Sequence, residues 1–408
     1  MTVTRQTFDQ VMIPCYVPQD MVLQRGSGCY LYDTEGKRYL DLSAGIAVNC
    51  LGHNHPEVVK TISEQAQRLI HVSNIFVNDK TLTLASELTA LTGFDKVFFT
   101  NSGAEANEAA LKLARRVAYD NFGPEKDEII SFAHSFHGRT LFSVSVGGQP
   151  KYSTGFGPVP GGITHLPFND SAALEQTFSD KTCAVILETI QGEGGILPID
   201  PEFLVKVRHL CDQHHALLIF DEVQTGVGRT GYFYSFEQFK DLDGGKGVRP
   251  DIMSSAKGLA AGIPIGAILT TDEIAAHFKP GTHGSTFGGN PLACAVGSVV
   301  LHTVSQPEFL AHVRAMGDLI KTKLNELNAK YHCFAQLRGQ GLLIGAELSA
   351  AYQGQSSALQ KLCTKHGLLV LVAGANVLRL TPPLIITPSE VNAAIELLEE
   401  ALQEFTAQ

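Results

Sequence analysis

The chain has 408 residues, of which 44% are hydrophobic and 18% charged, as in an ordinary globular enzyme and unlike a disordered chain. Lysine and arginine number 31 against 41 aspartates and glutamates. The resulting net charge of -10 argues against nucleic acid or an anionic membrane as the main partner, because both attract a basic face. At roughly 150 residues per domain, the length predicts two or three domains.

The eight cysteines are scattered and form no CxxC pair, which excludes zinc-ribbon spacing and does not resemble a disulfide framework. They are expected to be free thiols in a reducing compartment. The first ten residues lack the apolar core of a signal peptide. The most apolar run, from Gly367, is much shorter than the roughly 20 residues of a membrane span. We therefore expect a soluble, cytoplasmic protein.

Residues 1–54 are predicted to form an N-terminal segment containing a hairpin with the arms Tyr30–Asp33 and Lys37–Leu42. An amphipathic helix is predicted over His55–His71. Residues 55–285 then alternate short apolar runs with helical patterns, which is typical of a large α/β domain with a mostly parallel sheet between helices. The predicted strands are Lys96–Thr100, Glu128–Phe132, Cys183–Glu188, Ala216–Asp221, Asp251–Ser254 and Ile265–Thr270, and the clearest helices are Ala104–Phe122 and Pro201–His214.

Residues 286–408 are predicted to form a smaller α+β domain. A helical stretch covers about 291–330, and a terminal amphipathic helix covers about Ser389–Phe405. The predicted strands between them are Phe334–Leu337, Gly341–Leu348, Leu368–Val372 and Val377–Leu380. We found no internal repeat and no low-complexity linker.

Three local patterns point to chemistry, and each has a simpler alternative. The first is the junction at Ser102-Gly103-Ala104, where a strand ends and a helix begins with Glu105 at capping-box spacing. The carboxyl edge of a parallel sheet is where ligands bind, and the free N–H groups of a helix start favour phosphate. The alternative is a well-capped helix without a ligand.

The second pattern is a buried strand that ends in Asp221-Glu222. An aspartate at such a place usually meets a cation, a metal or a strong donor, since burial without a partner is costly. The alternative is a solvated acid at the end of a strand.

The third pattern is Lys257, which follows an apolar, small-residue strand and has no charged neighbour on its C-terminal side before Asp272. A lysine in this setting is a candidate for a lowered pKa and for Schiff-base chemistry. The alternative is an exposed loop lysine.

Two other patterns do not support a function. Gly226–Gly231 fits GxGxxG, but five residues separate it from the strand and an aromatic run follows, so a dinucleotide fingerprint and a dehydrogenase are disfavoured. His53 and His55, like His214 and His215, lack a third ligand at metal spacing, and no metal is expected.

Taken together, a phosphate cradle, a carboxylate and a reactive lysine are what pyridoxal 5'-phosphate requires. At this point the chain resembles the class III pyridoxal-phosphate aminotransferases, and within them the acetylornithine/succinylornithine aminotransferases. The resemblance runs over essentially the whole chain. It is carried by Asn101–Arg115, Phe136–Thr140, Gln191–Gly195, Ile219–Gly231, Gly281–Pro291 and Arg338–Leu342.

The resemblance implies the fold of the fold-type I PLP-dependent transferases and a role for each matching residue. Lys257 would carry the cofactor as a Schiff base and move the proton, and Asp221 would face the pyridine nitrogen. The other cofactor-binding residues implied are Ser102, Gly103, Ala104, Phe136, Gln224 and, from the other subunit of a homodimer, Thr286.

The resemblance also implies how substrate carboxylates are bound, since guanidinium groups bind carboxylates through two parallel hydrogen bonds. Arg139 would take the carboxylate far from the reacting amine, and Arg379 the α-carboxylate of glutamate. Glu193 would cover Arg379 when the ω-amine substrate is bound; a plain ion pair with Glu193 is the alternative for this arginine. Ser285 and Tyr16 would lie near the substrate.

The implied activity is transfer of the δ-amino group of N²-acetylornithine or N²-succinylornithine to 2-oxoglutarate, in arginine biosynthesis or catabolism. The nearest alternative is another ω-aminotransferase, acting on ornithine or 4-aminobutyrate. An aminomutase would return the amine to its own substrate and need no 2-oxoglutarate. A non-catalytic regulator predicts loss of Lys257 or Asp221, and both are present.

Overall fold

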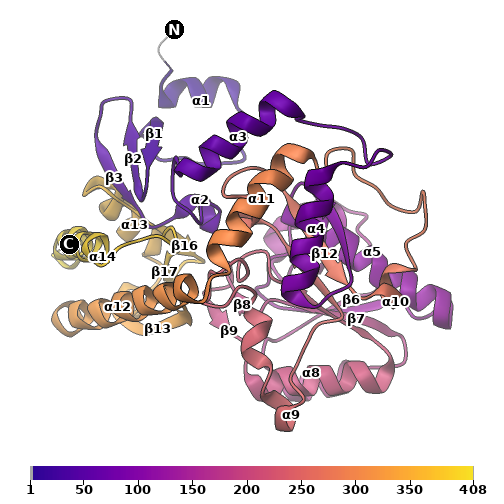
Figure 1. The fold of residues 1–408 in the computed structure, drawn as a ribbon. Helices are drawn as coiled ribbons and strands as arrows, with labels where there is room; N and C mark the ends of the chain where they lie inside the picture. Colours follow the sequence, from indigo (N-terminus) through magenta and orange to yellow (C-terminus); the bar gives the residue numbers. More distant parts are fainter. Residues whose placement is uncertain (1–2, 408) are drawn as a thin grey trace.

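The computed structural model describes residues 3–407. Its largest element is a central seven-stranded sheet (Figure 1). The strands lie in the order β4 (Lys96–Thr100), β12 (Gly266–Thr270), β11 (Ile252–Ser255), β10 (Leu217–Asp221), β7 (Thr182–Leu187), β5 (Glu128–Phe132) and β6 (Ile163–Leu166). All neighbours are parallel except at β12, which is antiparallel to both β11 and β4. The connection from β11 to β12 is too short for a parallel crossover. The predicted α/β class with a mostly parallel sheet is confirmed.

Helices cover both faces of this sheet. One face carries α5 (Gly103–Phe122), α6 (Leu141–Val146) and α10 (Asp272–Ala275), and the other carries α4 (Asp79–Thr92), α7 (Ser171–Thr177) and α8 (Pro201–His214). Neighbouring strand residues point to opposite faces, so Ile129 joins the cluster under α5 and Ile130 the cluster under α8. The central strands therefore carry apolar residues toward both faces, the pattern from which all of them except β6 were predicted.

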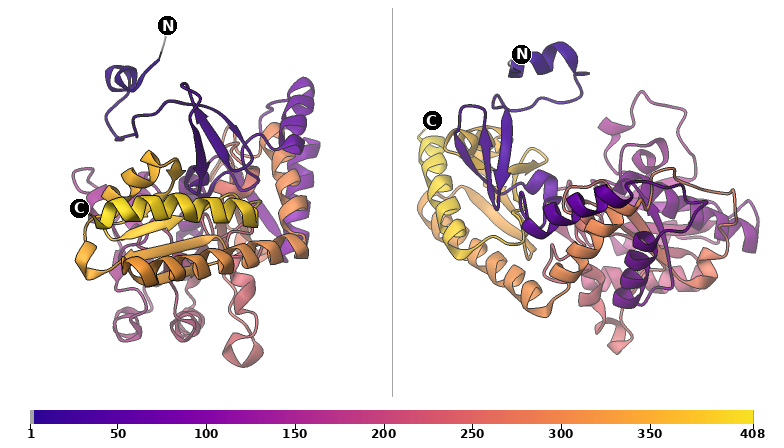
Figure 2. Two further views of the ribbon diagram at one scale, coloured as in Figure 1. Left: turned by 90° about the vertical axis from the view of Figure 1, so that its left-hand side faces the viewer. Right: turned by 45° about the horizontal axis from the view of Figure 1, so that its top comes forward.

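The N-terminal segment forms a second sheet with a strand from the far end of the chain. The segment contains α1 (Arg5–Val11), β1 (Leu23–Ser27), β2 (Tyr30–Asp33), β3 (Arg38–Asp41) and α2 (Ala44–Ala47), and α3 (Pro56–Arg68) follows it. The predicted hairpin is confirmed, with Tyr30 opposite Leu40. On its other side β3 pairs in parallel with β15 (Leu368–Leu369). Figure 2 shows this sheet beside the C-terminal helices, with α1 standing away from the rest.

The C-terminal residues build a third sheet, in the order β13 (Phe334–Gln340), β14 (Leu343–Leu348), β17 (Val377–Leu380) and β16 (Leu371–Ala373). Its helices are α12 (Pro307–Tyr331), α13 (Ser356–Lys365) and α14 (Pro388–Thr406). The predicted single stretch over 291–330 is instead two helices, since α11 (Pro291–Val304) ends before Pro307, which disfavours helix at the residue preceding it. The predicted strand Leu368–Val372 likewise divides at Val370 between two sheets.

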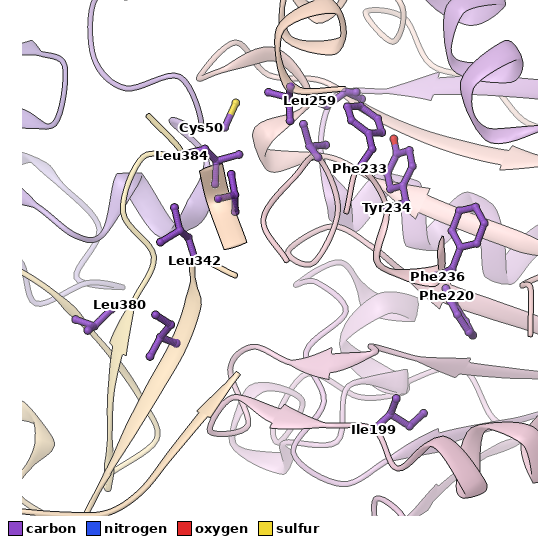
Figure 3. Packing of buried hydrophobic residues seen from close by; sticks show 14 of the residues in the cluster. Cys50, Ile199, Phe220, Phe233, Tyr234, Phe236, Leu259, Leu342, Leu380 and Leu384 are labelled. Atoms are coloured by element: carbon purple, nitrogen blue, oxygen red, sulfur yellow. The ribbon is translucent and has the colours of Figure 1, made fainter. Parts of the chain in front are cut away.

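A continuous buried core joins these parts. Leu342 and Leu384 from the C-terminal part lie on the side of Cys50, and Phe220 of β10 and Phe236 belong to the same cluster at the large sheet (Figure 3). The remaining short elements are β8 (Ile190–Gln191), β9 (Leu197–Pro198), α9 (Leu242–Gly245) and the 3-10 turns η1 (Pro150–Tyr152), η2 (Ser235–Phe239), η3 (Lys257–Ala260) and η4 (Ala350–Tyr352). The division of the chain at residues 54/55 and 285/286 stays a prediction.

All eight cysteines are free and all but Cys15 are buried, as expected. Among the described helices, none combines the length and apolar content that a bilayer crossing requires. Within residues 3–407 no three His, Cys, Asp or Glu side chains gather into a metal-ligand set.

Candidate active site

A cavity of about 230 Å³ opens at the carboxyl edge of the central sheet. The strands β4, β5, β7, β10 and β11 all run toward this edge, so the residues that follow them meet there. The cavity is lined by Gly103, Ala104, Asn107, Phe136, His137, Gly138, Arg139, Glu188, Asp221, Val223, Gln224 and Lys257. Seven of these residues were predicted from the sequence, and they come from segments that span more than 150 positions of the chain.

Asp221 is the last residue of β10 and is buried. Its Oδ2 accepts hydrogen bonds from Asn107 Nδ2 and from His137 Nδ1, both at 2.8 Å, while Oδ1 accepts the backbone N–H of Val223 at 3.0 Å. Burial alone would lower the pKa of His137, but the hydrogen bond and charge of Asp221 outweigh it and raise that pKa above its usual value. The aspartate is thus held by donors on one side while its side chain reaches the cavity wall.

Asn107 and His137 are functional residues that sequence reasoning missed. Asn107 is a buried polar residue on a face of α5 that is otherwise formed by alanines such as Ala106 and Ala110. An amide at a core position requires a partner, which is a signal that a sequence reader can use. For His137, next to Phe136, the sequence alone offered no such signal.

Lys257 is separated from β11 by Ala256 alone and begins the turn η3, with a left-handed backbone φ of 45°. That conformation is uncommon for a residue with a side chain and is found at sites where the surroundings enforce it. Burial lowers the pKa of Lys257 to about 8. The amine is therefore far more often neutral at physiological pH than an exposed lysine amine, which is the property that a nucleophile needs.

The start of α5 forms one wall of the cavity. The Ser102 hydroxyl accepts the N–H of Glu105 at 3.2 Å, as in the predicted cap, but the Glu105 carboxylate takes the N–H of Asn101 instead of closing the box on Ser102. A Cβ at Gly103 would lie 2.7 Å from Val223 Cγ1, so only glycine fits there. The closeness of Gly103 to Val223 brings the helix start, with its free N–H groups, to the cavity.

Phe136 is fixed by Glu188, a buried residue that follows β7 and was not predicted as part of the site. Glu188 Oε2 accepts the N–H of Phe136 at 3.1 Å, and Oε1 accepts the N–H of Gly192 at 3.1 Å. Burial raises the pKa of Glu188 to about 7. One carboxyl group thus joins the loop of the predicted stacking residue to the loop that carries Glu193.

Arg379 lies in the middle of β17 and is buried, yet it reaches the site from the C-terminal part of the chain. It forms an ion pair with Glu193 and donates to the carbonyl of Gly192 at 3.0 Å and to Gln224 Oε1 at 3.2 Å. Burial favours a higher pKa for Glu193, but the charges of Arg379 and Lys257 outweigh it and hold that pKa below its usual value. The ion pair given above as the alternative for Arg379 is present, and the role of this arginine in carboxylate binding stays a prediction.

Arg139 lies at the exposed mouth of the same cavity. None of the ion pairs among residues 3–407 includes it; its guanidinium carbon instead lies 3.7 Å from the ring centre of Tyr152 and 5.5 Å from that of Phe136. The two predicted carboxylate-binding arginines therefore border one site, one buried and paired and the other open.

Six predicted residues are not in the lining of this cavity. Ser102 precedes Gly103, and Arg379, which pairs with Glu193, contacts Gln224 of the lining, whereas the other three lie elsewhere. Ser285 and Thr286 line a separate cavity of about 810 Å³, where the Ser285 hydroxyl accepts from Asn101 Nδ2 at 3.2 Å. Tyr16 is 74% exposed and does not line either cavity. Within one chain, the structure does not bring these three side chains to the lysine.

Comparisons of this chain with known proteins all point to one family. The family profile described as aminotransferase class-III matches residues 14–402. An acetylornithine aminotransferase of Vibrio parahaemolyticus is 54% identical over 400 residues, covering 98% of each chain. A succinylornithine transaminase of Yersinia pseudotuberculosis is 51% identical over 408 residues, covering 98% of this chain and 97% of the other.

Solved structures agree. The N-acetylornithine aminotransferase of Stenotrophomonas maltophilia superposes with a TM-score of 0.84 at 39% identity, over 96% of this chain and 98% of that one. An ornithine aminotransferase of Toxoplasma gondii gives 0.91 at 31% identity, over 98% and 94%. Another structure of the Toxoplasma enzyme is described as having partial occupancy of PLP at its active site.

The residues of the cavity suit pyridoxal 5'-phosphate. Val223 and Phe136 offer apolar surfaces for a ring, Asp221 offers a carboxylate for its nitrogen, and the start of α5 offers N–H groups for phosphate. The lowered pKa of the Lys257 amine suits a Schiff base with the aldehyde of this cofactor. The chain therefore belongs to the class III aminotransferases, enzymes that use pyridoxal 5'-phosphate.

Proposed function

We propose that the protein transfers the δ-amino group of N²-acetylornithine or N²-succinylornithine to 2-oxoglutarate, giving an N-acylglutamate 5-semialdehyde and glutamate. The observation that carries the proposal is the pair of arginines that border one lysine, Arg379 closed by Glu193 and Arg139 open. Such a site suits two substrates that share one carboxylate position and differ at the other. The relatives at 51–54% identity carry acetylornithine or succinylornithine in their names, which supports an N-acylated donor.

Bound pyridoxal phosphate supplies a carbonyl that condenses with amines and a ring that withdraws electrons from the carbon that loses its proton. Lys257 Nζ would hold that proton and return it to the neighbouring carbon, for which a pKa of about 8 is well matched. Asp221, held by Asn107 and His137, keeps the ring nitrogen protonated. These buried donors would hold the carboxylate in one orientation for that role.

The remaining cofactor contacts follow from position. Ser102, Gly103 and Ala104 would hold the phosphate at the start of α5, Phe136 would stack on the ring, and Gln224 would bond the ring hydroxyl. Val223, on the wall with Phe136, would contact the ring as well.

Substrate discrimination would rest on the two arginines. Arg379 would bind the α-carboxylate of glutamate, and Glu193 would cover Arg379 during the half-reaction of the acylornithine, whose reacting δ-carbon bears no carboxylate. Arg139 would bind the carboxylate remote from the reacting amine in both half-reactions.

The protein would act in the cytoplasm as a homodimer, with the second subunit covering an apolar surface beside Ser285 and Thr286. Exposed side chains gather on the two segments that Asn74 joins through its hydrogen bonds to the carbonyls of Ser285 and Gly288. They are Ile75, Phe76, Val77 and Phe287, all at least 60% exposed. Exposed apolar groups of this kind mark protein interfaces. Thr286 would then reach the phosphate, and Ser285 and Tyr16 the substrate, in the site of the other subunit.

The test is the visible spectrum of the purified protein, followed by addition of N²-acetylornithine without a keto acid. A yellow band that fades supports both the cofactor and the donor, and 2-oxoglutarate should restore it. If the band fades only with ornithine or 4-aminobutyrate, that amine is the donor instead of N²-acetylornithine. Turnover without 2-oxoglutarate would indicate an aminomutase. A protein that shows no band even after pyridoxal phosphate is added would contradict the proposal.

A further inference from the structure

Arg139 carries an exposed positive charge that no carboxylate of residues 3–407 neutralises, although 41 acidic residues are present in the chain. Its guanidinium rests instead on the ring face of Tyr152, 3.7 Å from the ring centre. An aromatic face attracts a cation through its quadrupole without cancelling the charge. The charge therefore stays available to an incoming carboxylate.

Tyr152 is itself fixed relative to the cavity. It ends the turn η1, in which the rigid φ of Pro150 and the hydrogen bond from the Tyr152 N–H to the Gln149 carbonyl (3.0 Å) set the chain direction. The Gln149 side chain donates to the carbonyls of His134 at 3.2 Å and Ser135 at 3.3 Å. Those two residues directly precede Phe136.

Tyr152 also meets Phe136, with the ring centres 5.9 Å apart and the planes at 87°. This edge-to-face geometry is a favourable one for two aromatic rings. Arg139, Tyr152 and Phe136 thus form one packed group at the mouth of the cavity, with the guanidinium on its outer side.

We propose that Tyr152 is a positioning residue for substrate recognition: its ring face holds the Arg139 guanidinium toward the cavity mouth, oriented for the substrate carboxylate that is remote from the reacting amine. The inference rests on the proposed function, because it takes an acylornithine as the substrate that brings this carboxylate. A glutamate in the place of Tyr152 would also hold Arg139, but it would compete with the substrate.

The experiment compares Tyr152→Leu and Tyr152→Phe with two amines of equal length. N²-acetylornithine carries the carboxylate, and N-acetyl-1,4-diaminobutane lacks it. Tyr152→Leu should raise the KM for N²-acetylornithine about three- to tenfold with kcat little changed, and should leave the single-turnover rate with N-acetyl-1,4-diaminobutane as in the wild type. Tyr152→Phe, which keeps the ring face, should stay within roughly twofold of the wild type for both amines.

Several results would overturn the inference. An equal loss with both amines would mean that Tyr152 acts through Phe136 and the cofactor. A Tyr152→Phe variant as impaired as Tyr152→Leu would assign the effect to the hydroxyl. In an Arg139→Ala background, Tyr152→Leu should add nothing, and an additive loss would disconnect the two residues. Thermal midpoint and bound cofactor per chain check that each variant is folded.

The donor is tested separately by the wild type. If the wild-type band does not respond to N²-acetylornithine, the proposed donor fails, and the variants are compared with whichever carboxylate-bearing amine bleaches the band. If only the proposed role of Tyr152 is wrong, the wild type still responds to N²-acetylornithine, and the error shows in the ratio of the KM of the variant to that of the wild type.

Discussion

Arg139 lines the cavity of Lys257 and the charge of Arg379 acts on that lysine, yet the surroundings of the two arginines are opposite. Arg379 is buried in β17 and is surrounded by Glu193, Gln224 and a carbonyl, whereas Arg139 is exposed and rests on aromatic rings. A buried charge without a partner is costly, so it needs a carboxylate that has to leave before a substrate can bind. An exposed charge is solvated by water and needs no such partner. In the proposed function, burial would make Arg379 a conditional carboxylate site and exposure would make Arg139 a permanent one.

The largest effect should come from the residue that both arginines border. Lys257→Ala removes the amine that moves the proton, and kcat should fall by at least about 10⁴-fold. Single-turnover absorbance measurements with N²-acetylornithine provide the test. Lys246→Ala, at an exposed loop lysine, is the control and should behave as the wild type. Appreciable residual transamination by Lys257→Ala would reject the assignment.

The pH dependence of cofactor loading should reveal which arginine acts on Lys257. Only the neutral amine attacks the aldehyde, so the loading rate of the cofactor-free protein should rise with pH and level off above about 8. Between pH 6 and pH 8 the neutral fraction grows about 50-fold. The positive charge of Arg379 helps to keep this pKa low, and Arg139 is not among the groups that act on it.

The measurement is the growth of the visible band after pyridoxal phosphate is mixed with the cofactor-free protein at pH 6–10. Arg139→Ala should leave the midpoint unchanged. A rate that keeps rising toward pH 10.5 would show that Lys257 titrates as an ordinary lysine.

Arg379→Ala should separate the two half-reactions. It removes charged hydrogen bonds to the glutamate α-carboxylate, and kcat/KM for 2-oxoglutarate should fall roughly 30-fold. The half-reaction with N²-acetylornithine should fall much less, because Glu193 covers the arginine there. Stopped-flow spectra of each half-reaction make the comparison. Arg338→Ala is the control, since Arg338 lies in β13 of the sheet that also contains Arg379 and pairs with Glu347 at 2.8 Å. Equal losses in both half-reactions would contradict a conditional site.

Arg139→Ala should give the smallest effect, because an exposed arginine contributes less than a buried one. The KM for N²-acetylornithine should rise about tenfold with kcat nearly unchanged. Steady-state kinetics measures it, and Arg249→Ala, another arginine over an aromatic ring (Phe94, 4.1 Å), is the matched control. An unchanged KM would remove Arg139 from substrate binding.

The sequence was sufficient for features that depend on neighbouring residues. The strand-to-helix junction at Ser102, the buried strand that ends at Asp221 and the helix Pro201–His214 all follow from local apolar patterns and capping residues, and each was predicted within a residue or two. The seven cavity residues were found because each follows a recognisable strand or matches a family motif.

Features that depend on distant partners were not predicted. The pairing of β15 with β3, the contacts of Asn107 and His137 with Asp221 and the brace formed by Glu188 join segments far apart in the chain. Which residues pair in these contacts depends on how the whole chain packs, and the residue type at one position does not identify its partner. Likewise, Ser285, Thr286 and Tyr16 lie away from the lysine within one chain, and only the proposed homodimer would bring them to a site.

The strand β3 is synthesised early, but its parallel partner strand is synthesised late. Its parallel partner β15 lies near the end of the chain, and Lys37 bonds to the carbonyl of Lys365, 328 residues away, at 2.9 Å. At about 5–20 residues per second, the ribosome needs roughly 16–65 seconds to deliver that partner. Until then the hairpin presents an open strand edge, the kind of surface to which strands of another chain add. The first sheet to leave the ribosome thus stays incomplete until nearly the whole chain has been made, and for that time its edge is open to strands of another chain.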